Sequence, residues 1–173
     1  MIFKFNFYPK KEVKNISLID YIDKNSIMID VQETSKERLL SKMVERLDNC
    51  KLLLNKEEAE HSIMAREKLM STGVGNGVAI PHSKTNSVKS ITLTIATVKN
   101  GINYKSPDNK KVFVIFMLLS PKSSASDNLK VLTSIAAILR DNTHFIEKLI
   151  NSEKSDDILE LIAKEEMRVQ CQK

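Results

Sequence analysis

An unbroken apolar run, VFVIFMLL at residues 112–119, constrains the fold of this chain more than any other feature. Such a run is typical of a central strand that is buried on both faces of a sheet. A second segment, SITLTIATV at residues 90–98, alternates apolar residues with threonine and predicts a strand with one buried face. The short apolar run in GVAIPH, residues 77–82, predicts a third strand that ends at Pro81.

Helical patterns surround these strands. Residues 35–49 repeat apolar residues at helical spacing behind an N-cap at Ser35 or Thr34. Further helices are predicted at residues 56–70, 123–142, 143–151 and 155–166. Ser124 and Asp127 are placed like a capping box at the start of the second of these four. Helices before, between and after strands predict a single layered domain of the α/β class.

We expect this domain to cover residues 17–167, between an N-terminal extension at 1–16 and a short tail at 168–173. The extension alternates phenylalanine with polar residues in FKFNF, residues 3–7. This alternation favours an extra edge strand, and a docking segment for a partner is the alternative.

Composition narrows the class of protein. Hydrophobic residues make up 42% of the chain and charged residues 28%, which is typical of a soluble globular protein. The formal net charge is +5, but the lysines are interleaved with acidic residues, so we expect no nucleic-acid partner. No apolar run approaches the roughly 20 residues that span a bilayer, and the N-terminus lacks a signal-peptide cleavage site. We therefore expect a cytoplasmic protein that is not membrane-embedded. Cys50 and Cys171 are isolated and form neither a metal-ligand pattern nor a disulfide framework.

Three of the four glycines fall within five positions, in MSTGVGNGVAIPHSK at residues 70–84. Glycine tolerates positive φ and close backbone approach, so N–H groups around Gly75 to Gly77 could face an anion. The spacing matches neither a P-loop nor a dinucleotide-binding loop. Pro81 stiffens the backbone and presents His82 at a strand end. The alternative is a tight turn with an incidental histidine.

The helix before this loop carries an arginine among apolar residues. Arg66 shares a stripe with Ala59, Ile63 and Met70. A charge in that position calls for an anion or for hydrogen-bond acceptors. The alternative is an arginine at the margin of the stripe, or one bonded to carbonyl oxygens.

A polar residue also heads the apolar stripe of the helix at 123–142. Asn128 lies in the first turn, among unpaired N–H groups at a helix N-terminus, where anions bind. A simple capping asparagine is the alternative. His61 and His144 are predicted to face water.

The residue types around His82 exclude several chemistries. No histidine or cysteine is near it in sequence, there is no Gly-x-Ser-x-Gly elbow, and the glycine loop has no carboxylate. A neutral imidazole can instead act as a nucleophile toward phosphorus. Phosphoryl transfer of this kind asks for positioning and charge stabilisation, which an arginine and backbone donors supply without a metal or cofactor.

The segment REKLMSTGVGNGVAIPHSK strongly resembles the active-site segment of the enzyme IIA proteins of the bacterial phosphoenolpyruvate-dependent phosphotransferase system. It is similar to the fructose/mannitol class, and most similar to its nitrogen-regulatory branch. The resemblance runs from about residue 17 to residue 166 and includes LLSP, NLKVLTSIAAIL and SDDILELI. It implies a five-stranded mixed sheet flanked by helices.

The resemblance also implies roles for individual residues. His82 falls on the phosphoryl-accepting histidine and Arg66 on its supporting arginine, so these two are the expected catalytic residues. Further phosphoryl-binding residues are expected at Thr72, Gly75, Asn76, Gly77 and Asn128. The family commonly has a second histidine where this chain has Asn128. An amide can donate a hydrogen bond but cannot become cationic, so we expect phosphorylation to survive while its rate, the lifetime of the phosphoryl group or its onward transfer is altered.

Two functions follow from this resemblance. In both, the histidine-containing phosphocarrier protein is the donor, and the reaction is that of a phosphotransferase with a phosphohistidine intermediate. In the favoured one, the chain is a regulatory component of the nitrogen type, whose phosphorylation state governs a partner protein. In the alternative, it passes the phosphoryl group to a IIB component in sugar transport. A regulatory binding module without catalysis is a further alternative.

Overall fold

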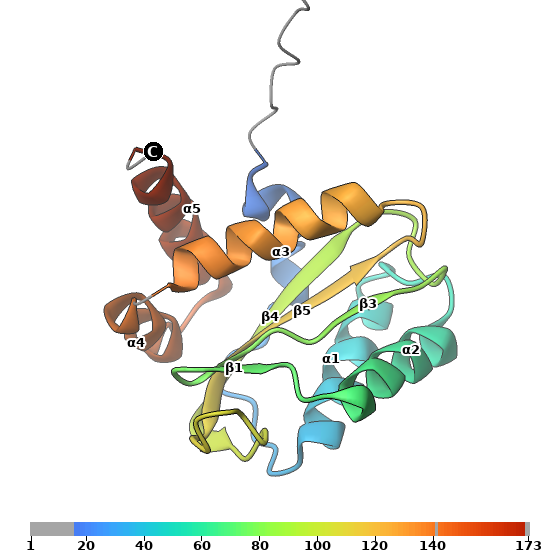
Figure 1. The fold of residues 1–173 in the computed structure, drawn as a ribbon, viewed down its shortest axis with the longest axis horizontal. Helices are drawn as coiled ribbons and strands as arrows, with labels where there is room; N and C mark the ends of the chain where they lie inside the picture. The colour runs from blue at the N-terminus through green and yellow to red at the C-terminus, as the bar shows by residue number, and fades with distance from the viewer. Residues whose placement is uncertain (1–15, 141, 172–173) are drawn as a thin grey trace, which may run out of the picture.

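The computed structural model describes residues 16–140 and 142–171 (Figure 1). Two short 3-10 helices open it, and five α-helices and five strands follow. The 3-10 helices are η1 (Leu18–Tyr21) and η2 (Lys24–Ser26). The α-helices are α1 (Lys36–Asn49), α2 (Lys56–Leu69), α3 (Ala125–Leu139), α4 (Thr143–Asn151) and α5 (Ser155–Cys171). The strands are β1 (Gly73–Gly75), β2 (Val78–Ala79), β3 (His82–Lys84), β4 (Thr92–Ile102) and β5 (Val112–Ser120).

The apolar run at 112–119 forms the central strand, as predicted. On one side, β5 pairs with β4 in the antiparallel direction. On its other side, β5 pairs in parallel with β2 and then with β3, which lie end to end along it. An antiparallel β1 completes the five-stranded sheet beyond β2. The sheet is therefore mixed, and the predicted α/β fold is confirmed.

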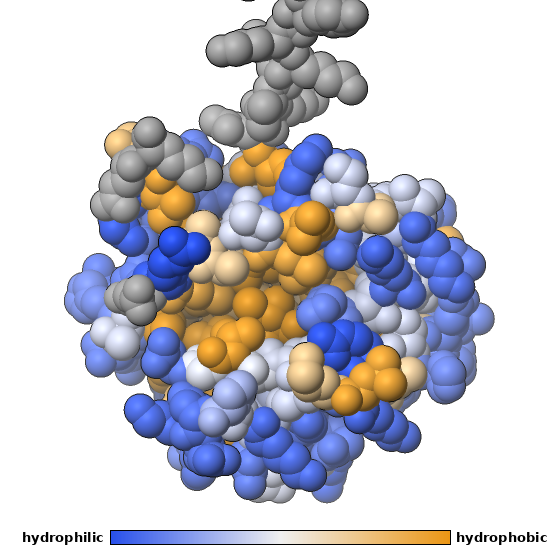
Figure 2. Space-filling model, viewed as in Figure 1, coloured by the Kyte–Doolittle hydropathy of each residue, from blue (hydrophilic) through white to orange (hydrophobic). Residues whose placement is uncertain are grey.

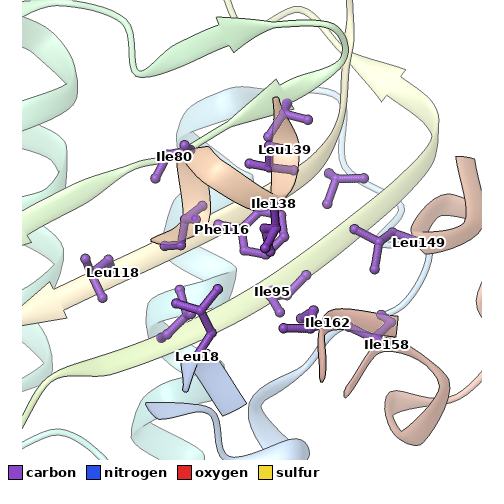
Figure 3. Close-up of a cluster of buried hydrophobic side chains, with 14 of the residues drawn as sticks. Leu18, Ile80, Ile95, Phe116, Leu118, Ile138, Leu139, Leu149, Ile158 and Ile162 are labelled. Carbon is purple, nitrogen blue, oxygen red and sulfur yellow. The ribbon is translucent and has the colours of Figure 1, made fainter. Parts of the chain in front are cut away.

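Helices cover both faces of this sheet, which gives three layers. The apolar residues of α1 and α2 pack on one face with Ile115, Met117 and Leu119 of β5. The apolar residues of α3, α4 and α5 pack on the other face, where Phe116 and Leu118 contribute from β5 (Figure 3). Figure 1 shows α3 crossing one side of the sheet, with α1 and α2 together on the other.

The prediction that β4 has one exposed face is wrong. Thr94 and Thr97 are buried as completely as the apolar residues between them. The end of η2 and the segment after it cover them: the Thr94 hydroxyl donates to the Ser26 carbonyl at 2.8 Å, and the Asp30 N–H donates to the Thr97 hydroxyl at 2.9 Å. Threonine suits a strand that is buried under an irregular segment. Its methyl group packs among apolar side chains, while its hydroxyl forms a hydrogen bond with the backbone of the covering segment.

Most helix boundaries lie close to those predicted. Ser35 caps α1 by accepting a hydrogen bond from the Arg38 N–H, and Asn55 caps α2 in the same way. Ser124 precedes α3, but its side chain accepts no capping hydrogen bond, so the predicted capping box is not formed. The last helix continues to Cys171, five residues beyond the predicted end. None of the helices in the described residues is long and apolar enough to cross a membrane. The expected edge strand at residues 3–7 lies outside the described residues.

Candidate functional site

The glycine cluster forms a tight β-hairpin. Gly75 and Val78 are paired, and the two residues between them form the turn that joins β1 to β2. Asn76 has φ +52° and Gly77 has φ +80°, which is the left-handed geometry of a type I′ turn. Gly75 has φ +89°, where the pairing of β1 with β2 shifts. These residues therefore satisfy the backbone conformation of a hairpin, which was the alternative interpretation of the cluster.

The turn of this hairpin lies at the far end of β2 from His82. The Gly77 carbonyl accepts from the Phe113 N–H at 2.8 Å, whereas His82 is paired with Leu118. Five residues of β5 separate these two levels, or roughly 16 Å at 3.3 Å per residue. In addition, the Asn76 N–H is already bonded to Asp108 at 3.0 Å. This corrects the expectation that Gly75, Asn76 and Gly77 surround a group on His82.

His82 lies at a break in the edge strand. The predicted third strand does not run unbroken to Pro81: β2 ends at Ala79, and β3 begins at His82 itself. The Pro81 carbonyl accepts from the Leu118 N–H at 2.9 Å, so the pairing with β5 resumes at once. Because paired residues of parallel strands point to the same face, His82 and Leu118 both project toward α3.

One hydrogen bond fixes the imidazole of His82. Its Nδ1 lies 2.8 Å from the Ile80 carbonyl oxygen, which can only accept. Nδ1 therefore carries the proton, and Nε2 of the neutral ring keeps its lone pair. The side chain is half-buried, so the ring has access to solvent. The backbone therefore determines which nitrogen of the neutral ring keeps its lone pair, which is a geometry that a nucleophilic imidazole would require.

A row of contacts between α2 and the edge strand leads to Arg66. The helix runs opposite to the strand: Leu54, just before the helix, is hydrogen-bonded to Ser87, and successive turns of α2 then pair Glu58 with Thr85 and Ser62 with Ser83. Each helical turn advances about 6 Å, which matches two strand residues. The next residue of this row is Arg66, and the next strand level is that of Pro81 and His82. By this register we expect Arg66 to lie near the edge of the sheet at the level of Pro81, next to His82 in the strand.

The guanidinium of Arg66 is not buried as the apolar stripe predicted. Its side chain is half-buried, and Nη1 donates to the Met70 carbonyl at 3.0 Å, which was the alternative that the sequence left open. The buried positions of α2 are Ala59, Ile63 and Glu67. Among the described residues, no carboxylate forms an ion pair with Arg66. Its charge remains available to an anion.

Asn128 lies on the same face of the sheet as His82. It is buried in the first turn of α3, with 7% of its surface exposed, as predicted. Its Oδ1 accepts from the hydroxyl of Ser120, two residues beyond Leu118 on β5, at 3.0 Å. With Oδ1 bonded to Ser120, the Nδ2 group is left as a donor, and it has no acceptor among the residues that the structure describes.

Comparison with known proteins decides the family. The family model described as "Phosphoenolpyruvate-dependent sugar phosphotransferase system, EIIA 2" matches residues 20–165. The chain belongs to this family. We refer to it below as the EIIA protein.

Relatives of the EIIA protein include both regulatory and sugar-specific proteins. It is 31% identical to a nitrogen regulatory protein of Bradyrhizobium diazoefficiens over 147 residues, which cover 84% of this chain and 94% of that one. It is 27% identical to the fructose-specific EIIABC component of Bacillus subtilis over 147 residues, or 85% of this chain. The match spans only 23% of that longer protein.

Solved structures agree with this assignment. The nitrogen regulatory protein IIA-Ntr from Neisseria meningitidis superposes with a TM-score of 0.78 at 30% identity, covering 84% of this chain and 99% of that one. The fold also matches enzyme IIA of the mannitol system of Escherichia coli, solved in complex with phosphorylated IIB, with a TM-score of 0.70. That match has 20% identity and covers 83% of the EIIA protein and 99% of the other chain.

Thr72 is engaged in a buried cluster of the EIIA protein. Its N–H donates to the Glu67 carboxylate at 3.1 Å, and its hydroxyl donates to the same carboxylate. Tyr104 lies against both, and burial raises the pKa of its hydroxyl far above the ordinary value, so it stays neutral. The hydroxyl of Thr72 therefore has a partner other than a group on His82, contrary to the sequence expectation.

Sequence reasoning missed three residues that hold this site together. Ile80 supplies the carbonyl that fixes the ring, Ser120 orients the amide of Asn128, and Glu67 anchors Thr72. The signal for Glu67 was available, because it lies four residues after Ile63 on the buried side of α2. The other two depend on pairing between segments far apart in the sequence. His61 and His144 are exposed, as predicted. The described residues contain no metal-binding group of three or more His, Cys, Asp or Glu side chains.

The surface around the strand break is apolar. Figure 2 shows apolar side chains gathered between α3 and the β1–β2 hairpin. Large apolar side chains are exposed on the elements that border the break: Leu69 and Met70 at the end of α2, Val74 in β1 and Leu129 in α3. Apolar side chains that gather into one exposed patch are typical of surfaces that bind another protein.

Proposed function

We propose that the EIIA protein accepts a phosphoryl group on Nε2 of His82 from the histidine-containing phosphocarrier protein, in the cytoplasm, and acts as a regulatory component of the nitrogen type. The observation that carries this proposal is the hydrogen bond from Nδ1 of His82 to the Ile80 carbonyl. In the neutral ring this bond leaves the lone pair on Nε2, and the side chain is only half-buried. The apolar surface around the break supports docking of a donor protein.

The proposed step is a direct transfer between two imidazoles. The lone pair on Nε2 of His82 forms a bond to phosphorus, while the phosphorus–nitrogen bond to the donor ring breaks and leaves its electron pair on that ring. The proton on Nδ1 stays in its hydrogen bond to Ile80. Arg66 stabilises the charge on the phosphoryl oxygens, and the Nδ2 group of Asn128 donates to one of them. We leave Gly75, Asn76 and Gly77 out of this site because of the register of the hairpin.

The regulatory role is supported by similarity along nearly the whole length of two nitrogen regulatory proteins. The second candidate is transfer from His82 to a IIB component in sugar transport. Similarity to a fructose-specific EIIABC component, and to a mannitol IIA solved with phosphorylated IIB, supports this candidate. Both candidates begin with the same phosphorylation of His82.

Reconstitution with phosphoenolpyruvate, enzyme I and the phosphocarrier protein of the same organism tests the proposal. We expect one acid-labile phosphoryl group per chain, absent in His82→Ala, whose thermal stability should match that of the wild type. Uptake of label by His82→Ala, or none by the wild type, would contradict the proposal. Adding IIB proteins and a sugar then separates the two roles, because a fast chase of the label indicates transport and a persistent label indicates regulation.

A further inference from the structure

The EIIA protein buries an ion pair beneath the end of α2. The Lys36 ammonium lies 3.0 Å from Oε1 of Glu67, and the two side chains are 11% and 5% exposed. The ammonium also lies 4.9 Å from the centre of the Tyr104 ring. Burying two charges costs free energy that an apolar pair would not, so such a pair is weak evidence for stability alone. The hydrogen bonds that the Glu67 carboxylate accepts therefore indicate its role better than its contribution to stability does.

A continuous path of hydrogen bonds leads from Glu67 to the ring of His82. The carboxylate accepts the N–H of Thr72 at 3.1 Å and the hydroxyl of the same residue. The Thr72 carbonyl accepts from the Ile80 N–H at 2.9 Å. The Ile80 carbonyl in turn accepts Nδ1–H of His82 at 2.8 Å. Every link of the path after the carboxylate involves the backbone at the start of β1 or at the strand break.

We propose that Glu67 is a positioning residue for His82, which holds Thr72 and through it the Ile80 carbonyl that keeps the proton on Nδ1. This inference rests on the proposed function of His82. Glu67 does not touch the reacting atoms. It acts by fixing the place of the carbonyl, and a displaced carbonyl would let the proton move to Nε2, which then has no lone pair for phosphorus.

The chemistry of the cluster requires a carboxylate in this place. Three close donors converge on Glu67, namely the N–H and hydroxyl of Thr72 and the ammonium of Lys36, and the Tyr104 hydroxyl lies further away at 3.5 Å. A carboxylate has two oxygens and only accepts, so it satisfies all three. A glutamine would replace one oxygen with an NH₂ group and set a donor against a donor. Glu67→Gln therefore changes the hydrogen bonding of the cluster with little change in volume.

The chain offers a matched control in Glu166. This residue of α5 is also buried, with 6% exposed, and its carboxylate also accepts a backbone N–H and a hydroxyl. The donors are Leu18, at 2.7 Å, and Ser17, at 3.1 Å, at the start of η1. Burial raises the pKa of Glu166, so its ionisation opposes folding as the pH rises past the unfolded-state value of Glu. Both variants are therefore compared at a single pH where the wild-type chain is folded.

The experiment measures the tautomer of His82 and the rate of phosphoryl uptake in the full chain. ¹⁵N NMR of the ring nitrogens reports where the proton sits when the ring is neutral. We expect Glu67→Gln to shift His82 from the Nδ1–H form to a mixture and to slow phosphorylation roughly tenfold or more, since a small misplacement costs that much. Glu166→Gln should change neither. An unchanged tautomer and rate in folded Glu67→Gln would overturn the inference.

Two further variants keep the test decisive if Glu67→Gln does not fold. Thr72→Val removes only the hydroxyl link and should shift the tautomer in the same direction by less, whereas Thr72→Ser should restore the wild-type tautomer. A wild-type tautomer in Thr72→Val would then count against the inference. Failure of the proposed function is distinguishable, because a chain that takes up no phosphoryl group still reports its His82 tautomer.

Discussion

The two ends of β2 fix their backbone by different means. At the hairpin end, Asn76 and Gly77 hold left-handed φ values of +52° and +80°, and the conformation depends on residues that tolerate them. At the other end, His82 follows a proline, and its ring is held by a hydrogen bond to the Ile80 carbonyl. The hairpin end needs residues that tolerate positive φ, and the His82 end needs specific hydrogen-bond partners.

This difference separates the residues that make the turn from those that carry chemistry. The glycines allow a two-residue hairpin, and the hairpin brings Thr72 against Ile80, which fixes the carbonyl behind His82. Changes at the hairpin end should therefore reduce the free energy of unfolding and spare the reaction. Changes around the strand break should slow phosphoryl transfer and leave the free energy of unfolding nearly unchanged.

The largest effect is expected at Arg66. Arg66→Ala removes the charged group that we expect the α2 row to bring near His82, so the rate of phosphoryl uptake should fall about 100-fold. The melting temperature should change little, because the side chain is half-buried and its described hydrogen bond is to a carbonyl of its own helix end. A rapid-quench measurement of labelled phosphohistidine gives the rate.

The control for this variant is Arg46→Ala. Arg46 also lies in the last turn of its helix, α1, and is exposed. It should leave the rate unchanged. Equal rates for the two variants would mean that the α2 row does not bring Arg66 to the reacting group.

A smaller effect, on stability alone, is expected at the hairpin. Gly77→Ala places a side chain at φ +80° and a Cβ 3.1 Å from Cδ2 of Phe113. We expect it to lower the free energy of unfolding by about 1–2 kcal/mol, measured by urea denaturation. The rate of phosphoryl uptake per folded molecule should be unchanged. Asn76→Gly is the matched control, since glycine accepts the same left-handed φ. A slow reaction in a stable Gly77→Ala would instead support the prediction that backbone N–H groups of the glycine cluster bind the phosphoryl group on His82.

The architecture could be predicted from the sequence because it depends on local patterns. The apolar run at 112–119, short and rich in β-branched and aromatic residues, favours a strand that is covered on both sides, and the helices around it follow from spacing and capping. The burial of Thr94 and Thr97 could not be predicted. Their partners, Ser26 and Asp30, come from an irregular segment more than sixty residues away.

The site was predicted less completely. His82, Arg66 and Asn128 could be proposed because polar residues interrupt apolar patterns at those positions, although the sequence left a structural alternative open for each, and the structure shows Arg66 bonded to a carbonyl oxygen. The glycine cluster was assigned to anion binding because positive φ serves both a cradle and a type I′ turn, and only the register with β5 distinguishes them. Ile80 and Ser120 carry no signal in their own residue types, since one acts through its carbonyl and the other through a contact with α3.

The smallest effect is expected at Asn128, where a neutral amide replaces a group that can become cationic. Asn128→His should change the rate of uptake only a few-fold, because one neutral donor contributes about 1 kcal/mol. It should also make the hydrolysis rate of the phosphorylated chain depend on pH near 6.5, because the new imidazole gains a charge there and the wild-type amide does not titrate.

The hydrolysis rate from pH 5.5 to 8 measures this pH dependence, with Asn128→Ala as the control that lacks any donor. Asn128 lies outside the site if both variants lose the phosphoryl group at the wild-type rate across that range. A hydrolysis rate that depends on pH in Asn128→His but not in Asn128→Ala would mean that a charge at position 128 acts on the phosphoryl group. At the hairpin, by contrast, residue type should affect stability alone.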